Sequence, residues 1–231
     1  MYHLIDFYYA ERETCLREVL ILSFPCHQMR IERMQRTHIP SFFFSRFFFK
    51  QCIYTYILPS YDRYIGKLRG DTSQQRYCLY DSGLAPKNAP KQYMYDRDAS
   101  VILRQQLADI YYILPHAKDG VRKMIVLLPK PSSRWAPKDE NDSMLSSYNR
   151  GDMSKLLVLN RDVDDSGALW AFKPSTKNFT LLWNGWTGRQ RVMAFGKVAK
   201  DQFRIMFKHP FSYVQAFALS VSACVAKRSR S

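Results

Sequence analysis

A run without charged side chains near the C-terminus limits the folds that this chain can adopt. From Phe211 to Ala226 the sequence has no charged residue, and Pro210 suits the first residue of a helix, because proline lacks only an N–H that would be unpaired there. The apolar residues point in several directions around the predicted helix, as is typical of a helix in a protein core or a membrane. A bilayer needs about 20 residues, and this run is shorter. We therefore expect a buried helix, with a C-terminal membrane anchor as the alternative.

The composition narrows the classes of partner and compartment. The 231 residues carry a net charge of +15, which favours anionic partners, either nucleic acid or acidic lipid head groups. The five cysteines form no CxxC pair and the histidines no HExxH motif, so we predict no disulfide framework, no metal site and no cofactor. Reduced thiols favour the cytosol or nucleus. We expect no secretory signal, because Asp6, Glu11 and Arg12 lie where an apolar segment is needed.

The N-terminal quarter of the chain has two unlike parts. Residues 1–28 could form a helix, and we treat them as an extension outside a main domain of residues 29–231. Ile39–Leu58 is rich in phenylalanine and long enough for a transmembrane span, but Arg46 and Lys50 would each cost about 2.5–3.5 kcal/mol at a helix centre. Aromatic and β-branched residues favour strands there instead.

A β pattern dominates the rest of the chain. The segments predicted as short strands are Arg76–Tyr80, Leu107–Leu114, Lys123–Leu128, Leu156–Asn160, Ala168–Phe172, Asn178–Trp183, Gln190–Phe195 and Phe203–Phe207. Turn signals at Asp119-Gly120, Asp164–Gly167 and Asn184-Gly185 predict three hairpins. The Pro-, Ser- and Asp-rich stretch Pro129–Gly151 is interpreted as a surface loop.

The strands and the helix together predict an architecture. Many short strands indicate a sandwich or a barrel, and a helix that is apolar all round is buried on every side if a sheet closes around it. We therefore predict a mostly β protein, a closed antiparallel β-barrel around the C-terminal helix. The alternative is a sheet with the helix on one face. It requires a polar stripe, for which Ser212, Gln215, Ser220 and Ser222 are the candidates.

Several short motifs, in order along the chain, resemble those of tubby-like proteins. They are YIGKLR at Tyr64–Arg69, YD at Tyr80-Asp81, LRQQLA at Leu103–Ala108, GVRKM at Gly120–Met124, KNF at Lys177–Phe179, FGKVAKD at Phe195–Asp201 and QAFA at Gln215–Ala218. The resemblance implies a closed barrel around a hydrophobic C-terminal helix, in agreement with the pattern above. Residues 34–63 and 168–178 are shorter than in that family, so the barrel could be trimmed at its N-terminal edge.

The resemblance also implies a function. Tubby-like proteins bind phosphatidylinositol 4,5-bisphosphate at the cytosolic face of the plasma membrane, and have been proposed to act as transcription regulators in the nucleus and to carry cargo to cilia. We therefore expect a monomeric, membrane-associated phosphoinositide-binding adaptor without a transmembrane span, with protein cargo as a further partner. The alternative is a nucleic-acid-binding transcription regulator that uses the same basic surface.

Candidate residues for this site follow from spacing and from the resemblance. Lys67 and Arg69 are two apart, so on a strand both side chains lie on one face, about 7 Å apart. The resemblance implies that both bind the lipid head group together with Arg104, that Arg76 lies where a further basic residue is common, and that Lys123 enlarges the positive field. The alternative interpretation is an ordinary solvated strand face.

Other chemistries find little support in the sequence. Asp162, Asp164 and Asp165 resemble the start of a calcium loop, but the twelfth position is Lys173 where an acidic residue is required. This also counts against a lipid scramblase-like relative, a family that shares the barrel. No serine or cysteine lies in a nucleophile motif. We therefore predict that the protein is not an enzyme.

Overall fold

One antiparallel sheet accounts for most of the described chain. The computed structural model describes residues 3–9, 19–22, 28–33, 41–47, 64–88, 103–113, 122–137, 142–162, 171–185 and 188–226. Twelve strands pair in the order β2-β1-β12-β11-β10-β9-β8-β7-β6-β5-β4-β3. Their bounds are β1 His3–Tyr9, β2 Val19–Leu22, β3 Gln28–Arg33, β4 Ser41–Phe47, β5 Tyr64–Gly70, β6 Arg76–Asp81, β7 Gln106–Ile113, β8 Lys123–Pro129, β9 Leu156–Arg161, β10 Phe179–Gly185, β11 Gly188–Ala199 and β12 Gln202–Phe207.

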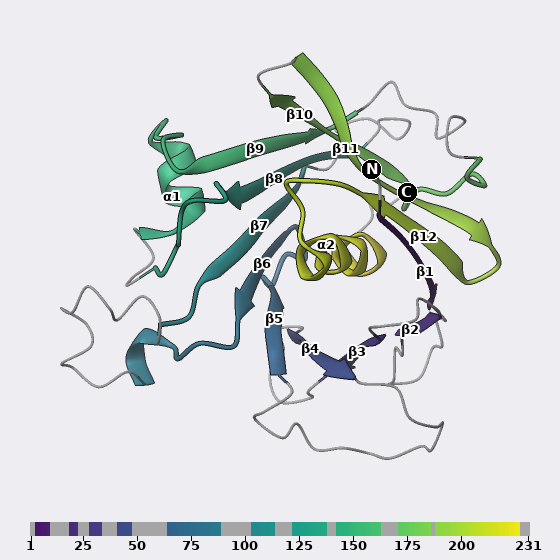
Figure 1. The fold of residues 1–231 in the computed structure, drawn as a ribbon, viewed down its shortest axis with the longest axis horizontal. Coiled ribbons are helices and arrows are strands. Elements are labelled where there is room, and N and C mark those ends of the chain that lie inside the picture. Colours follow the sequence, from purple (N-terminus) through teal and green to yellow (C-terminus); the bar gives the residue numbers. More distant parts are fainter. Residues whose placement is uncertain are drawn as a thin grey trace.

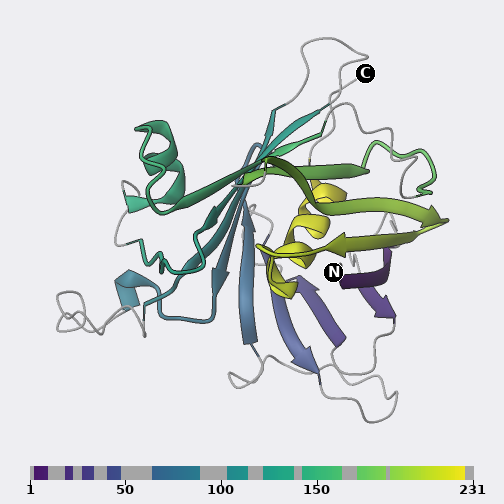
Figure 2. The same cartoon turned by 45° about the horizontal axis from the view of Figure 1, so that its top comes forward.

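The sheet curls around a single helix, α2 (Tyr213–Val225), which lies inside the curve in both ribbon views (Figures 1 and 2). β2 and β3, the two ends of the strand order, contact each other. Within the described residues no hydrogen-bonded pairing joins them. The prediction of a mostly β fold around the C-terminal helix is confirmed, whereas the described strands do not form a barrel closed by hydrogen bonds.

The helix begins later than the sequence predicted. Ser212 is its N-cap: the Ser212 hydroxyl accepts a hydrogen bond from the Gln215 N–H at 3.3 Å, and the Gln215 side chain accepts one from the Ser212 N–H at 2.8 Å. This reciprocal capping box satisfies two N–H groups that the helix leaves unpaired. Pro210 therefore precedes the helix, and its predicted role as the first helical residue is wrong.

α2 is buried along almost its whole length. Every residue from Gln215 to Cys224 is buried, and Phe217 is fully inaccessible. The inner face of the sheet supplies the other half of this core, with Leu68, Tyr77, Leu79, Ala108, Ile110 and Tyr112 among its members. A helix surrounded in this way needs apolar residues on all sides, which explains the pattern in the sequence.

The polar residues of α2 do not form an exposed stripe. Ser220 and Ser222 are fully buried, and each hydroxyl donates to a helix carbonyl one turn earlier. The Ser222 hydroxyl also lies 2.7 Å from the Tyr112 hydroxyl of β7, and the Gln215 side chain donates to the carbonyl of Leu107. These bonds satisfy the buried polar groups, so the exposed polar stripe that a helix on one face of a sheet requires is not found along α2.

A smaller apolar cluster covers part of the outer face. α1 (Met144–Asn149) lies over β7 and β8, and its Met144 packs with Leu127, Trp135 and Leu156. The prediction of an irregular surface loop for Pro129–Gly151 is therefore partly wrong. Two of its large apolar residues, Trp135 and Met144, are buried, and burying them orders the segment against the sheet.

Two further predictions are corrected. Within residues 1–28, the described segments His3–Tyr9 and Val19–Leu22 are the strands β1 and β2 rather than a helix, and β1 pairs with β12. The division of the chain at residue 28 stays a prediction. β9 pairs with β10 rather than with a strand at Ala168–Phe172; of that predicted strand only residues 171 and 172 are described, and neither is in a strand. Residues 163–170 and 114–121, with two predicted turns, lie outside the described residues.

The remaining predicted strands are confirmed, and their ends differ from the predicted ends by two residues at most. The exception is β11 (Gly188–Ala199), which contains the predicted Gln190–Phe195 but is longer. In the phenylalanine-rich region, β4 (Ser41–Phe47) is a strand, and residues 48–63 lie outside the described residues. No helix within the described ranges combines the length and apolarity needed to cross a bilayer.

Candidate functional site

The outer face of β5 and β6 carries the two basic residues that the sequence singled out. Lys67 pairs with Tyr80 and Arg69 with Cys78, while Leu68 and Leu79 between them point into the core. Because side chains alternate along a strand, Lys67 and Arg69 lie on the outer face. Lys67 is partly buried and Arg69 is exposed.

Arg104 reaches the same region from another segment. Its N–H donates to the carbonyl of Leu84 at 2.8 Å, in an approach made close by Gly83, where a Cβ would lie 2.7 Å from the Arg104 Cα. The guanidinium carbon of Arg104 lies 4.1 Å from the centre of the Tyr80 ring. Since Tyr80 is the strand partner of Lys67, the structure brings Arg104 to Lys67.

Asp81 holds this arrangement in place. One oxygen of its carboxylate accepts hydrogen bonds from the Gly83 N–H at 2.9 Å and the Gln105 N–H at 2.8 Å. The end of β6 is thereby tied to the segment that enters β7. The backbone on both sides of Arg104 is fixed, which limits where its guanidinium can lie.

The electrostatics of Lys67 reflect its neighbours. Burial lowers the pKa of its ammonium group, and the positive charges of Arg69 and Arg104 lower it further. Three cations are therefore close enough to repel one another across a partly buried surface. An anion bound among them would relieve this repulsion. We call Lys67, Arg69 and Arg104 the basic cluster.

Arg76 belongs to a different set of contacts. Its Nε and Nη2 donate to the two oxygens of Asp109 at 3.1 Å and 2.8 Å, and the Asp109 side chain is 0% exposed. Burial opposes the charge of Arg76, but its hydrogen bonds with Asp109 and the nearby negative charge raise its pKa above the ordinary value. Arg76 lies next to the basic cluster in the sheet, with its guanidinium committed to Asp109.

Lys123 lies away from the basic cluster. It pairs with Ile113 at one end of β7, whereas Tyr80 pairs with Gln106 at the other end. β7 has 8 residues, so its two ends are roughly 24 Å apart. The structure therefore does not bring the exposed Lys123 to Lys67.

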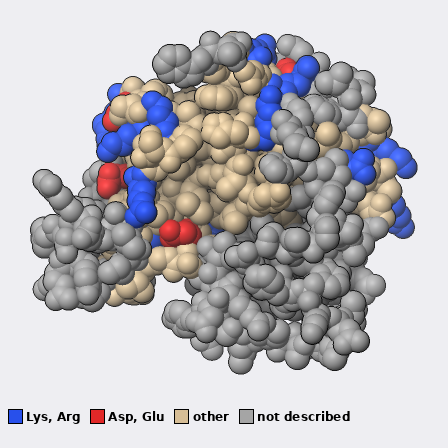
Figure 3. Space-filling view, in the orientation of Figure 1, with Lys and Arg blue, Asp and Glu red and all other residues tan. Residues whose placement is uncertain are grey.

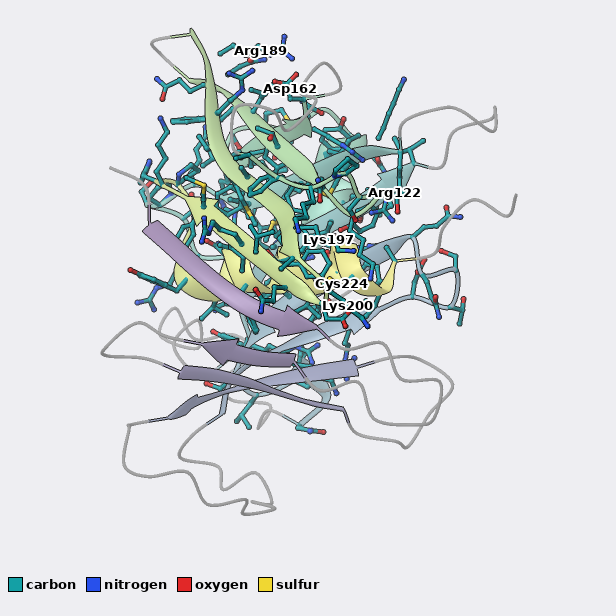
Figure 4. All side chains as sticks on the ribbon, turned by 90° about the vertical axis from the view of Figure 1, so that its right-hand side faces the viewer. Arg122, Asp162, Arg189, Lys197, Lys200 and Cys224 are labelled. Atoms are coloured by element: carbon teal, nitrogen blue, oxygen red, sulfur yellow. The ribbon has the colours of Figure 1, made fainter. Side chains whose placement is uncertain are left out.

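Basic residues also gather in another part of the molecule. Arg161 donates to the carbonyls of Arg122 and Asn178, and the Lys197 N–H donates to the Asn178 side chain. Figure 4 labels Arg122 and Lys197 in this region. On the face drawn in Figure 3, Lys and Arg side chains are spread over the described surface and outweigh the acidic ones. Positive charge alone thus does not distinguish the basic cluster.

The acidic residues offer no metal centre in the part of the chain that the structure describes. Asp162, the first residue of the rejected calcium pattern, is buried, and its oxygens lie 3.5 Å from Arg189 and 3.4 Å from Arg191 (Figure 4 labels Asp162 and Arg189). Asp164 and Asp165 lie outside the described residues.

Asp109 is the residue that sequence reasoning missed. A charged residue between Ala108 and Ile110, both fully buried, signals a buried polar contact, because an unpaired carboxylate is costly to bury. Its partner could not be found by spacing, since Arg76 and Asp109 are 33 residues apart in the chain.

Comparison with known proteins gives one consistent result. A model of the Tub family matches residues 48–224. Tubby-related protein 2 of Homo sapiens is 29% identical over 180 residues, which are 70% of this chain and 33% of that protein. Tubby-related protein 3 of Mus musculus is 30% identical over 184 residues, which are 72% of this chain and 38% of that protein. Tubby protein homolog 1 of Caenorhabditis briggsae is 29% identical over 185 residues, which are 70% of this chain and 41% of that protein. The chain thus spans well under half the length of these relatives.

Proposed function

This chain belongs to the Tub family, and we propose that it binds phosphoinositides through the basic cluster on the outer face of β5 and β6. The preferred ligand is phosphatidylinositol 4,5-bisphosphate at the cytosolic face of the plasma membrane. The protein acts there as a peripheral, monomeric adaptor in signalling, without catalysis. Binding to the membrane brings it near its protein partners.

One observation carries the proposal: cations from two separate segments meet on one face. Lys67 and Arg69 come from β5 and Arg104 from the segment before β7; burial lowers the pKa of Lys67, and the charges of Arg69 and Arg104 lower it further. A planar guanidinium can hold a phosphate through two parallel hydrogen bonds, and the ammonium adds a compact charge. Two phosphates on one inositol ring suit cations separated by about 7 Å.

The setting of the cluster supports reversible binding. The cations lie on a rigid sheet, and Arg104 is restrained by its stacking on Tyr80, so little side-chain freedom is lost on binding. Each basic residue near an anionic membrane adds about 1 kcal/mol of attraction. Specific contacts to one head group and general attraction to the surface therefore act together.

The test compares two double variants, each of which removes two positive charges. In Lys67→Ala/Arg69→Ala the basic cluster is broken. In Lys155→Ala/Lys200→Ala two exposed lysines from turns elsewhere are removed. Binding is measured by co-sedimentation with phosphatidylcholine vesicles that contain phosphatidylinositol 4,5-bisphosphate. Charge-assisted hydrogen bonds are worth about 1.5–3 kcal/mol each, so the first variant should lose about two orders of magnitude in affinity, and the control only a few-fold.

Two further measurements separate the alternatives. The soluble inositol trisphosphate head group should compete with vesicles for the wild-type protein, because the ring itself is recognised. Equal losses in both double variants would mean that diffuse charge explains binding. Binding to duplex DNA that the first variant abolishes, together with no vesicle binding by the wild type, would favour the transcription-regulator function instead.

A further inference from the structure

A fourth cation lies within reach of the basic cluster but is held apart from it. Arg69 pairs with Cys78, and Arg76 is two residues from Cys78 on the same strand, so Arg76 is the diagonal neighbour of Arg69 on the same outer face. Diagonal neighbours in an antiparallel pair are about 7–8 Å apart, within reach of long side chains. By position alone, Arg76 could join the ligand site.

The Asp109 carboxylate prevents this through a fully satisfied set of contacts. One oxygen accepts from Arg76 Nε and from the Cys78 thiol, at 3.1 Å and 3.3 Å. The other accepts from Arg76 Nη2 and from Gln106 Nε2, at 2.8 Å and 3.0 Å. With its side chain fully inaccessible, the carboxylate depends on these donors, and breaking the pair would leave a buried charge without its counter-ion.

The contacts around Asp109 also restrict movement of the pair. The Gln106 side chain, which donates to Asp109, accepts a hydrogen bond from the Met144 N–H at the start of α1. The backbone N–H of Gln106 donates to the carbonyl of Trp135. Asp109 is therefore fixed from the side of the smaller apolar cluster, and it holds Arg76 toward β7 and away from β5.

We infer that Asp109 is a specificity-determining residue of the anion site: it keeps Arg76 as a neutral pair, so that Lys67, Arg69 and Arg104 alone meet the ligand. The inference rests on the proposed function. Its consequence is that the site has less positive charge than its sequence indicates, and is matched to inositol rings with two phosphate monoesters, as in phosphatidylinositol 4,5-bisphosphate, rather than three. Asp109 limits the positive charge that the ligand meets by pairing with Arg76, and does not itself contact the ligand.

Variants of the two neighbouring arginines give the first test. Arg76→Gln/Asp109→Asn removes the neutral pair as a whole, so that no buried carboxylate is left without its counter-ion, and Arg69→Gln removes one charge from the adjacent position of the same face. Vesicles carry phosphatidylinositol 4-phosphate, 4,5-bisphosphate or 3,4,5-trisphosphate at equal total lipid charge. Arg76→Gln/Asp109→Asn should stay within about twofold of the wild type, whereas Arg69→Gln should lose about tenfold or more, as expected for a charge-assisted phosphate contact. Equal losses in the two proteins would show that Arg76 contacts the ligand, and would overturn the inference.

Release of Arg76 gives the second test. Asp109→Asn keeps the side-chain shape but removes the negative charge, so Arg76 can turn toward the ligand. Affinity should rise, by about five- to tenfold for the trisphosphate and less for the monophosphate, and Arg76→Gln/Asp109→Asn should abolish the gain. A purely structural role of Asp109 would lower affinity or leave it unchanged, and a folded Asp109→Asn protein without a gain overturns the inference.

The design keeps the two proposals separate. If the wild-type protein binds none of the vesicles, the proposed function fails before the variants are compared. If the wild-type protein binds the vesicles and soluble inositol phosphates compete with the vesicles for it, the variants decide whether the inference about Asp109 holds. Thermal unfolding identifies an Asp109→Asn protein that does not fold, and the comparison of Arg76→Gln/Asp109→Asn with Arg69→Gln then decides alone.

Discussion

Strands β5, β6 and β7 present alternate residues to an inner face packed on α2 and to an outer face with the charged side chains. On the inner face Leu68, Leu79 and Ile110 contribute to the core around the helix. On the outer face the contacts are between charges, such as the bidentate pair of Arg76 and Asp109. The same strands thus depend on apolar packing on one face and on contacts between charged groups on the other.

This difference indicates which amino-acid substitutions each face of the sheet tolerates. Burial of apolar area has no direction, so the inner face depends on volume and packing, and related apolar residues can substitute for one another. The outer face depends on which donor meets which acceptor. A change of one atom type, such as Asp109→Asn, alters it without changing volume. The inner face therefore governs stability, and the outer face is proposed to govern binding.

The largest expected effect is on the inner face. Phe217→Ala removes a fully inaccessible ring from the centre of the core and should lower the free energy of unfolding by about 3–5 kcal/mol. Met153, which is 38% exposed, gives the control: Met153→Ala should change it by about 0.5 kcal/mol or less. Urea denaturation measures both. A loss below about 1 kcal/mol for Phe217→Ala would contradict the packing of α2 described above.

An intermediate effect is expected at Gly83, in the bend that follows β6. A Cβ there would lie 2.7 Å from the Arg104 Cα and 2.9 Å from the carbonyl carbon of Leu103, so the backbone must shift. Gly83→Ala should destabilise the protein by about 1–3 kcal/mol and displace Arg104. Affinity for phosphoinositide vesicles should fall by about tenfold if Arg104 contacts the ligand.

Gly151 provides the matched control for Gly83. Its φ is +78° and nothing lies within 4 Å of an added Cβ, so Gly151→Ala introduces strain of about 1–2 kcal/mol without a clash. Its stability should fall to a similar extent, but vesicle binding should be unchanged. A similar loss of affinity in both variants would attribute the Gly83 effect to general destabilisation.

The smallest effect concerns pH. Since burial and the charges of Arg69 and Arg104 lower the pKa of Lys67, this lysine loses its proton at a lower pH than an ordinary lysine. Affinity for phosphoinositide vesicles should therefore decrease as pH rises through that lowered pKa. Arginine stays charged throughout this range, so Lys67→Arg should remove the decrease. Vesicle binding measured from pH 7 to pH 10 tests this, and an unchanged pH profile in Lys67→Arg would exclude Lys67 as its source.

Local patterns in the sequence predicted much of the fold and part of the site. The alternation in Phe203–Phe207 and the short strand-like run Arg76–Tyr80 identified strands, and the uncharged run from Phe211 identified the buried helix. Spacing alone put Lys67 and Arg69 on one face, because side chains of a strand alternate whatever its neighbours are. Trp135 and Met144, in a stretch rich in loop residues, were missed because their burial depends on the sheet beneath them.

Contacts across strands depend on register, which local patterns do not contain. The pairing of Cys78 with Asp109 puts Arg76, two residues earlier on β6, diagonally across from Asp109. The pairing of β7 with β8 puts Lys123 opposite Ile113, at the other end of β7 from Gln106, which pairs with the strand partner of Lys67. The sequence by itself determined which residues are charged and which face of a strand they share. Only the tertiary structure decided which charges meet, because partners distant in the chain are brought together by strand pairing and by the packing of the sheet around α2.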